Sequence, residues 1–462
     1  MPIRRILVAN RGEIAARIVR TCDRLGIETV LAASEADLDS VPARLAGSVI
    51  CIGPARPAAS YLNVNAVIAA ALAARADAIH PGYGFLAENA GLARSCAAAG
   101  LIFIGPAAAQ LAGAGDKLRA RENALAAGLP VVPGGEVCDV GAAHRLAREI
   151  GWPVLVKAVG GGGGRGIRQV GDPRDLRPAI ERAVAEAGAA FGDPRVYLER
   201  FVAPGRHVEV QLLADGDNAI HLGDRDCSVQ RRYQKLVEEA PAPRLTARLR
   251  AGMHQAATAL GAHMRYRGAG TVEFLVDTRR DAFYFLEMNA RIQVEHPVTE
   301  AVCGIDIVAE QIWVAEGHPC PAQESVAIAG HAIECRINAE DWTRDFEPSP
   351  GTVTAAVFPA GDGIRVDTCV QAGTPVPPFY DPLLAKLIAG GKDRGEALRR
   401  LRGALARCEI SGVATNLAMH ARLVADEEFA RGGVDTAWFS RFLAGHTAPA
   451  REARAGARSP DG

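Results

Sequence analysis

The first hundred residues alternate short apolar runs with alanine-rich segments of helical periodicity. A run at residues 6–9 is followed by apolar side chains at helical spacing up to Gly26. Further short apolar runs occupy residues 27–32, 49–52, 78–80 and 102–104. Strands that alternate with helices pair in parallel and are covered on both faces, so this pattern predicts a doubly wound parallel sheet. No GxGxxG follows the first run, which argues against a Rossmann dinucleotide site there.

The rest of the chain is too long to pack around the hydrophobic core of this first sheet. At 462 residues and about 150 residues per domain, roughly three domains are expected. The pattern predicts a small subdomain up to residue 203, a larger α+β body after it, and strands with proline and glycine punctuation from about residue 330. Residues 447–462 are rich in Ala, Arg, Pro and Gly and are expected to form a disordered tail.

Charge and cysteine spacing narrow the class of protein. A formal net charge of −1 gives no electrostatic reason to expect a nucleic acid or an acidic membrane as partner. The ten cysteines include no CxxC pair, which argues against a zinc ribbon or a disulfide framework. The N-terminal apolar run ends at Asn10, and no apolar stretch approaches the ~18 residues that cross a bilayer. We therefore expect a soluble, cytoplasmic protein.

Five consecutive glycines occupy residues 160–164, between apolar runs at 153–159 and 167–170. Such a run is either a flexible linker or a hairpin flap whose bare backbone N–H groups close over an anion. A P-loop would need Gly-Lys-Ser/Thr and a following helix, and neither is present. Lys157 lies on the run that enters the glycines, as expected for a lysine that reaches polyphosphate oxygens. Its position favours the phosphate flap.

Residues 285–296 read FLEMNARIQVEH, with apolar side chains at every even position from 286 to 294. The odd positions carry polar groups: Glu287, Asn289, Arg291, Gln293 and Glu295. In a strand these five share one face. A solvated face of a surface strand is the simple interpretation. Two carboxylates and two amides around one arginine favour a binding site instead.

Glu273 adds a third carboxylate to this face. It lies in the apolar run 271–276, upstream of a turn near Asp281, so hairpin pairing is expected to bring it beside Glu287. Carboxylate and amide oxygens are hard ligands that suit Mg²⁺ bound to nucleotide phosphates. An arginine on the same face can clamp an anion, and a further carboxylate can act as a base. The sequence therefore predicts a metal–nucleotide site beside a small anion site.

Lysine is scarce in this chain. Of 52 lysines and arginines, only five are lysines: Lys117, Lys157, Lys235, Lys386 and Lys392. A lysine that survives such a bias marks either a chance leftover or a place where a compact ammonium cannot be replaced by a flat guanidinium. Three of the five fall in the segments that carry the phosphate-like motifs.

Several longer segments are characteristic as a set: ILVANRGEIAARI, HPGYGFLAEN, KAVGGGGGRGIR, RDCSVQRRYQKLVEEAPAP, FLEMNARIQVEHPVTE, ECRINAED and FYDPLLAKL. With these segments in this order, the chain resembles the biotin carboxylase family of the ATP-grasp superfamily over roughly residues 3–445. The segments RIQVEHPVTE and ECRINAED separate this family from other ATP-grasp ligases.

The resemblance implies a fold and a reaction. It implies a doubly wound N-terminal domain at 1–112, an ATP-grasp domain at 113–325 with a mobile glycine-rich lid at 131–203, and a mainly-β C-terminal domain at 326–446. ATP would phosphorylate bicarbonate to carboxyphosphate, which yields CO₂ for attack by N1′ of biotin. The cofactors would be ATP and Mg²⁺ or Mn²⁺, with biotin as a carrier-bound substrate.

The resemblance also implies which residues bind the nucleotide and metal. Lys117 and Lys157 would hold ATP phosphates under the lid glycines Gly163 and Gly164. The remaining nucleotide contacts would come from Glu199, Arg200, Phe201, Val202 and His207. Mg²⁺ would bind Glu273, Glu287 and Asn289, and both glutamates would thereby contact ATP.

A second implied set handles bicarbonate and biotin. Bicarbonate would bind Lys235, Arg291, Gln293 and Val294. Glu295 would be its base, and Arg336 would stabilise the biotin enolate. The chain departs from its relatives at Arg200, Tyr233, Ala290, Phe379 and Pro382. These positions leave the catalytic set intact and concern mainly the acceptor side.

The partners follow from the same resemblance. Biotin is carried on a lysine flanked by methionines, and no lysine here adjoins a methionine. We therefore expect a separate biotin carboxyl carrier protein, carboxyltransferase subunits and a homodimer, as in the biotin carboxylase subunit of acetyl-CoA carboxylase. Subunits of pyruvate, propionyl-CoA or other acyl-CoA carboxylases remain alternatives. A non-catalytic paralogue that binds ATP is a further alternative, disfavoured by the intact catalytic set.

Overall fold

A parallel sheet forms the N-terminal part of the computed structural model, which describes residues 2–159, 167–203 and 205–446. The strand order is β3-β2-β1-β4-β5, and every pair is parallel. The strands are β1 (Arg5–Val8), β2 (Glu28–Ala33), β3 (Ser48–Cys51), β4 (Ala78–His80) and β5 (Ile102–Phe103). The predicted doubly wound sheet is therefore confirmed.

Both faces of this sheet are covered, as the alternating pattern predicts. On one face Ile6 and Val8 of β1 pack in a core with α1 (Gly12–Arg24) and α11 (Ile307–Glu316). On the other face Leu7 packs with α3 (Val64–Ala73) and α4 (Ala90–Ala98). The short helix α2 (Val41–Leu45) follows β2. Helices α5 (Ala108–Gly115) and α6 (Lys117–Ala126) then lead out of this part of the chain.

A small antiparallel sheet follows, with strand order β6-β9-β7-β8. Its elements are β6 (Gly134–Val137), α7 (Val140–Ile150), β7 (Val154–Ala158), β8 (Ile167–Val170), α8 (Leu176–Phe191) and β9 (Val196–Arg200). Strands β7 and β8 form the expected hairpin, in which Lys157 pairs with Ile167. The predicted lid glycines Gly163 and Gly164 lie outside the described residues, as does the predicted tail at 447–462.

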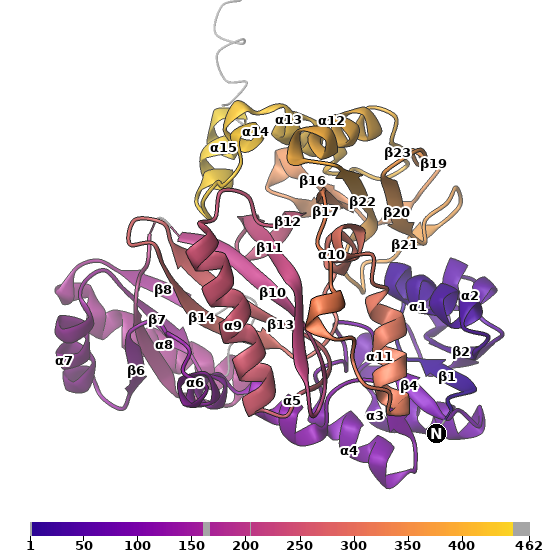
Figure 1. The fold of residues 1–462 in the computed structure, drawn as a ribbon, viewed down its shortest axis with the longest axis horizontal. Helices are drawn as coiled ribbons and strands as arrows, with labels where there is room; N and C mark the ends of the chain where they lie inside the picture. The colour runs from indigo at the N-terminus through magenta and orange to yellow at the C-terminus, as the bar shows by residue number, and fades with distance from the viewer. Residues whose placement is uncertain (1, 160–166, 204, 447–462) are drawn as a thin grey trace, which may run out of the picture.

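The largest sheet is antiparallel and joins the central and C-terminal parts of the chain. Its strand order is β14-β13-β10-β11-β12-β15-β22-β20. The strands are β10 (Gly205–Asp215), β11 (Ala219–Arg231), β12 (Gln234–Ala240), β13 (Arg267–Asp277), β14 (Ala282–Asn289), β15 (His331–Asn338), β20 (Ile364–Thr368) and β22 (Leu383–Gly391). Helix α9 (Ala247–His263) lies over β10 and β13 in Figure 1, and its residues share a core with these two strands.

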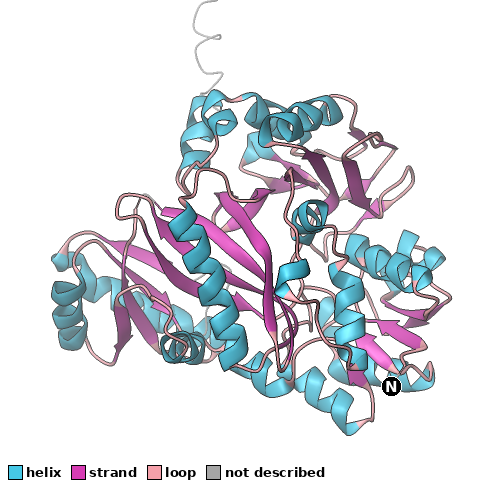
Figure 2. Cartoon of the chain, in the orientation of Figure 1, coloured by secondary structure: helices cyan, strands magenta, loops and turns pink. Residues whose placement is uncertain are grey.

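The C-terminal part combines strands with helices. The prediction of a mainly-β domain describes residues 331–391, whereas the chain from Arg394 onward is largely helical, as the cyan elements at the top of Figure 2 show. These helices are α12 (Arg394–Leu405), α13 (Leu417–Ala425), α14 (Glu427–Arg431) and α15 (Trp438–His446). Leu398, Leu401 and Leu405 lie at helical spacing in the buried core, and this periodicity explains α12.

Short strands complete this part of the chain in two-stranded pairs. They are β16 (Glu340–Asp341) with β17 (Glu347–Pro348), β18 (Gly351–Thr352) with β21 (Pro375–Val376), and β19 (Ala355–Val357) with β23 (Glu409–Ser411). In the described part of the chain, no helix has the length and apolar character that a bilayer crossing requires.

The strand predicted over residues 285–296 is shorter than expected. Strand β14 ends at Asn289, and helix α10 (His296–Cys303) begins seven residues later. The N–H of Ala290 donates to the carboxylate of Glu88 rather than to a neighbouring strand. Pro297 in the first turn of α10 fits a helix start, because proline has no N–H to leave unpaired there. The extended-strand prediction was wrong for residues 290–295.

Candidate active site

The ammonium of Lys235 lies at the centre of a buried polar cluster. Its Nζ is 2.6 Å from Glu209 Oε2, 2.9 Å from Glu273 Oε1 and 2.7 Å from Glu295 Oε1. Gln293 Oε1 is a fourth acceptor, at 3.0 Å. Burial alone would lower the pKa of Lys235, but the three carboxylates outweigh it and hold the pKa well above its ordinary value. Lys235 is therefore a permanent cation in this cluster.

The carboxylate of Glu295 lies between two cations and accepts hydrogen bonds from both. Lys235 donates to its Oε1, and Arg336 Nη2 donates to its Oε2 at 3.0 Å. Arg336 is itself fixed by Glu238, whose Oε1 accepts from Nε at 2.6 Å. Burial alone would raise the pKa of the Glu295 carboxyl. The charges of Lys235, Arg336 and Arg225 outweigh burial and hold this pKa below its ordinary value, so the group is ionised. The structure thus brings together Lys235 and Glu295, which are predicted to act on bicarbonate, and Arg336, which is predicted to act on biotin.

Glu273 and Glu287 are paired across strands β13 and β14, as predicted from the turn between them. Asn289 Nδ2 donates to Glu273 Oε1 at 3.0 Å and lies 3.5 Å from Glu287 Oε1. Like charges directly opposite each other destabilise a sheet unless cations compensate them. Lys235 and His207 compensate Glu273, while Glu287 is exposed. The carboxylate oxygens of Glu273 and Glu287 suit a divalent cation placed at Glu287, whereas the amide oxygen of Asn289 accepts from Arg291.

Arg291 holds the loop that follows β14. Its Nε donates to Glu88 Oε2 at 2.9 Å, and its Nη2 donates to Asn289 Oδ1 at 3.0 Å. Its Nη1 donates to the Ile292 carbonyl at 3.1 Å. Burial opposes the charge, but Glu88 outweighs it and the pKa of Arg291 is raised. The anion-clamp role expected for Arg291 stays a prediction.

Two predicted phosphate ligands meet near the small sheet. Lys157 forms an ion pair with Glu199 of β9, and the Nζ of Lys117 lies 3.5 Å from the Ala158 carbonyl. Burial lowers the pKa of Lys117, and the nearby charge of Lys157 lowers it further. Two cations that repel each other in a partly buried place favour a polyanionic ligand.

Three further residues expected at the nucleotide lie at the end of β9 and just after it. Arg200 Nη2 donates to the Tyr284 hydroxyl at 2.9 Å, and the N–H of Phe201 donates to the Pro153 carbonyl at 2.9 Å. Val202 is buried. The backbone of this segment is thereby fixed between the small sheet and β14, where a flat ring could pack against it.

The contact between His207 and Glu273 predicts a pH-dependent stability. His207 Nε2 lies 2.9 Å from Glu273 Oε2, and this carboxylate outweighs burial to raise the pKa of His207 above 6.5. Stabilisation from a raised histidine pKa is present below the unfolded pKa and is lost as the pH rises through the folded one. We expect His207→Gln to lower the melting temperature more at pH 6 than at pH 9, by differential scanning fluorimetry. Equal losses at both pH values would contradict this.

Several partners of the site residues were missed from sequence. Glu209, Glu238 and Glu88 each hold a predicted site residue in place. Glu209 carried a signal, because His207, Glu209 and Gln211 alternate along β10 as the polar residues of 287–295 do. Its partner Arg225 is fully buried and also donates to Gln211 at 2.6 Å. Glu238 and Glu88 had no such signal.

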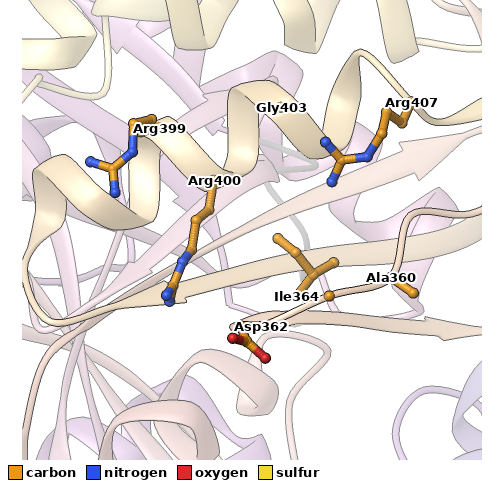
Figure 3. Close-up of a pocket in the computed structure, with 8 residues that line it drawn as sticks. Ala360, Asp362, Ile364, Arg399, Arg400, Gly403 and Arg407 are labelled. Carbon is orange, nitrogen blue, oxygen red and sulfur yellow. The ribbon is translucent and has the colours of Figure 1, made fainter.

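A second concave region lies away from this cluster. A cavity of about 230 Å³ is lined by Arg399 and Arg400 of α12, by Arg407 just after that helix, and by Asp362. Figure 3 shows the guanidinium groups of Arg400 and Arg407 on the side of the helix toward Asp362. None of the predicted site residues lines it.

Family models match three consecutive parts of the chain. Residues 2–111 match the biotin carboxylase N-terminal domain, and residues 334–441 match the biotin carboxylase C-terminal domain. Residues 116–323 match the ATP binding domain of the carbamoyl-phosphate synthase L chain. Together these matches span most of the described chain.

Individual proteins are similar over nearly the whole length. A biotin carboxylase of Pseudomonas aeruginosa is 50% identical over 446 residues, which cover 96% of this chain and 99% of the relative. The biotin carboxylase–beta-gamma-ATP complex of Campylobacter jejuni has a TM-score of 0.92 at 45% identity, covering 95% of this chain and 99% of that one. The biotin carboxylase domain dimer of Hydrogenobacter thermophilus 2-oxoglutarate carboxylase, with MgADP, ADP and bicarbonate, has a TM-score of 0.91 at 43% identity; coverage is 96% and 98%.

Proposed function

The chain belongs to the biotin carboxylase family, and we propose that the buried cluster around Lys235 is where it carboxylates biotin at the expense of ATP and bicarbonate. The protein is an ATP-dependent carboxylase, a ligase that uses ATP, Mg²⁺ and carrier-bound biotin. The observation that carries the assignment is the grip of Lys235 and Arg336 on the single carboxylate of Glu295. A small anion that enters between these cations meets a base and two positive charges together.

Nucleotide binding is assigned to a second group of residues near Lys235. Lys117 and Lys157 hold phosphate oxygens, and Gly163 and Gly164 of the glycine run are assigned to the same phosphates. Glu199, Arg200, Phe201, Val202 and His207 line the rest of the nucleotide. Glu273, Glu287 and Asn289 hold Mg²⁺, which when bound neutralises phosphate charge during phosphoryl transfer.

Bicarbonate is placed among Lys235, Arg291, Gln293 and the backbone of Val294. Glu295 removes the bicarbonate proton, and the resulting oxyanion attacks the γ-phosphorus of ATP to give carboxyphosphate and ADP. Carboxyphosphate then breaks into CO₂ and phosphate. The phosphate takes the N1′ proton of biotin, and the resulting enolate attacks the CO₂ through N1′. Arg336 stays charged throughout and stabilises the enolate oxygen of biotin.

The test is bicarbonate-dependent ADP release. The purified chain is incubated with ATP, Mg²⁺ and free biotin, with and without bicarbonate, and ADP is followed with a coupled assay. We expect ADP release only when bicarbonate is present, and faster release when biotin is added. A chain that binds ATP but releases no ADP with bicarbonate would instead be a non-catalytic paralogue.

The exposed carboxylate of Glu287 gives a prediction about the metal. Glu287→Gln keeps the size of the side chain but removes one of two facing negative charges. We expect the Mg²⁺ concentration for half-maximal activity to rise about 10- to 100-fold, the range seen when a group that supports a metal is lost. The matched control is Glu340→Gln in β16, outside the cluster. An unchanged Mg²⁺ requirement would remove Glu287 from the metal site.

The partners are proposed on the same basis. The sequence contains no lysine beside a methionine, so the biotin carrier lies outside it. We propose that the chain works with a biotin carboxyl carrier protein and carboxyltransferase subunits in the cytoplasm as a homodimer, within acetyl-CoA carboxylase. A pyruvate, propionyl-CoA or other acyl-CoA carboxylase is the alternative, since the first half-reaction is shared. The carboxyltransferase that co-purifies with the chain would identify the acceptor.

A further inference from the structure

Lys386 is a fully buried lysine for which the proposed reaction has no use. It lies in β22, and its side chain has 0% exposure. Its Nζ donates to the carbonyl oxygen of Val294 at 2.9 Å and is 3.1 Å from Glu13 Oε1. A buried ammonium is costly to desolvate, and a hydrophobic residue of similar volume is often as stable in such a place. Stability alone therefore does not explain it.

The register of the sheet explains how Lys386 reaches the site. In β15, β22 and β20 the residues Arg336, Lys386 and Asp367 lie directly opposite one another, so their side chains share one face. Arg336 and Lys386 are thus neighbouring cations. Each is compensated separately: Arg336 by Glu238 and Glu295, and Lys386 by Glu13 and Asp367. The carboxylate of Asp367 lies 3.7 Å from Lys386 Nζ.

These two cations hold consecutive residues of one loop. Arg336 donates to the Glu295 side chain, and Lys386 donates to the Val294 carbonyl. From the other side, Lys235 contacts the side chains of Gln293 and Glu295. Residues 293–295 are outside any strand and precede α10, so no ladder of backbone hydrogen bonds fixes them. The carbonyls of Gln293 and Glu295 accept the turn bonds at the start of α10, from the N–H groups of His296 and Val298. The Val294 carbonyl and the Gln293 and Glu295 side chains are held by the three cations.

Lys386 remains charged in this place. Burial alone would lower its pKa, but Glu13, Asp367 and Glu334 together raise it above the ordinary value. Glu13 comes from α1 and also accepts from the Tyr83 hydroxyl, so the ammonium connects the N-terminal sheet to the loop. A side chain without a donor would lose this connection.

We propose that Lys386 is a positioning residue for bicarbonate, which sets the Val294 carbonyl and thereby the orientation of the Gln293 and Glu295 side chains. This inference rests on the function proposed above. It accounts for a lysine rather than an arginine, because a single nitrogen must fit between a carbonyl oxygen and the Glu13 carboxylate within a closed core. Lys386 itself touches no substrate.

The test compares Lys386→Met with Lys392→Met. Methionine keeps an unbranched stem of similar volume without the charge, and Lys392 is an exposed lysine near the end of the same strand. The double variant Glu13→Gln/Lys386→Met also removes the carboxylate that would be left unpaired. KM is measured for bicarbonate and for ATP separately, because loss of folded protein lowers kcat without changing either KM.

We expect the bicarbonate KM to rise at least tenfold in both Lys386 variants, with the ATP KM within twofold of wild type. Lys392→Met should match wild type in both. A bicarbonate KM within twofold of wild type, an equal rise in both KM values, or failure of both variants to fold would overturn the proposal. Wild-type protein without bicarbonate-dependent ADP release would refute the proposed function, whereas an active wild type beside an unaltered Lys386→Met would refute only this inference.

Discussion

Glu295→Gln is expected to lower kcat for bicarbonate-dependent ADP release by roughly 10²–10³-fold, within the range for loss of a general base. The amide keeps the size and one acceptor oxygen but cannot take a proton. Lys235 and Arg336 hold the pKa of the carboxylate below its ordinary value, which makes it a weak base in the empty cluster. An incoming anion that takes up part of their charge raises that pKa, so basicity appears when the substrate binds.

The fold is expected to survive this change. Lys235 keeps Glu209 and Glu273 as partners, and Arg336 keeps Glu238, so neither cation is left without a carboxylate. The KM for ATP should stay within twofold of wild type, and the melting temperature should change by a few degrees at most. A kcat within fivefold of wild type would exclude Glu295 as the base and leave it as a ligand that orders the two cations.

Local pairing in this protein could be predicted from sequence because turns fix it. The turn near Asp281 joins two apolar runs, and this alone was enough to place Glu273 opposite Glu287. The short connection between residues 153–159 and 167–170 likewise predicted a hairpin with Lys157 at its end. In both cases the residues that meet are separated by fewer than twenty positions.

The alternation of polar and apolar residues gave a wrong strand prediction where the backbone leaves the extended conformation. The polar and apolar pattern of residues 285–296 continues past Asn289, although the strand does not. Glu88, about two hundred residues away in sequence, accepts the Ala290 N–H and so replaces a strand neighbour. An alternation of polar and apolar residues shows only that every second side chain is buried. An extended loop that packs between two layers can bury every second side chain as well as a strand does.

The charged partners of the site residues were the hardest part of the structure to predict from the sequence. Lys386 lies within the apolar run of residues 383–389, so a strand there buries its side chain. A buried lysine needs a carboxylate as partner. Glu13 and Asp367 come from α1 and β20, and nothing in their local sequence identifies them as its partners. Only the order of strands in the large sheet and the packing of α1 bring these residues together.

Lys235→Arg is expected to lower kcat/KM for bicarbonate at least ~100-fold while retaining the charge, comparable to the loss of a preorganised donor to a developing charge. One ammonium nitrogen lies 2.6–3.0 Å from four acceptors on two strands and a loop. A guanidinium spreads its donors over a flat fork about a carbon, so it cannot place a nitrogen at that single point. The melting temperature should fall little. By contrast, Lys235→Met removes the cation that Glu209, Glu273 and Glu295 share, and loss of one partner of a buried pair costs about 3–5 kcal/mol.

The pair of variants separates charge from geometry. If charge alone mattered, Lys235→Arg would retain more than a third of wild-type kcat/KM, and that result would contradict the geometric argument. Lys392→Arg is the matched control, since its exposed side chain has room for either cation and should leave both rate and stability unchanged. Loss of activity in Lys235→Arg at a wild-type melting temperature therefore assigns the function of this lysine to the position of one nitrogen atom. The same comparison explains why a chain so rich in arginine keeps a lysine here.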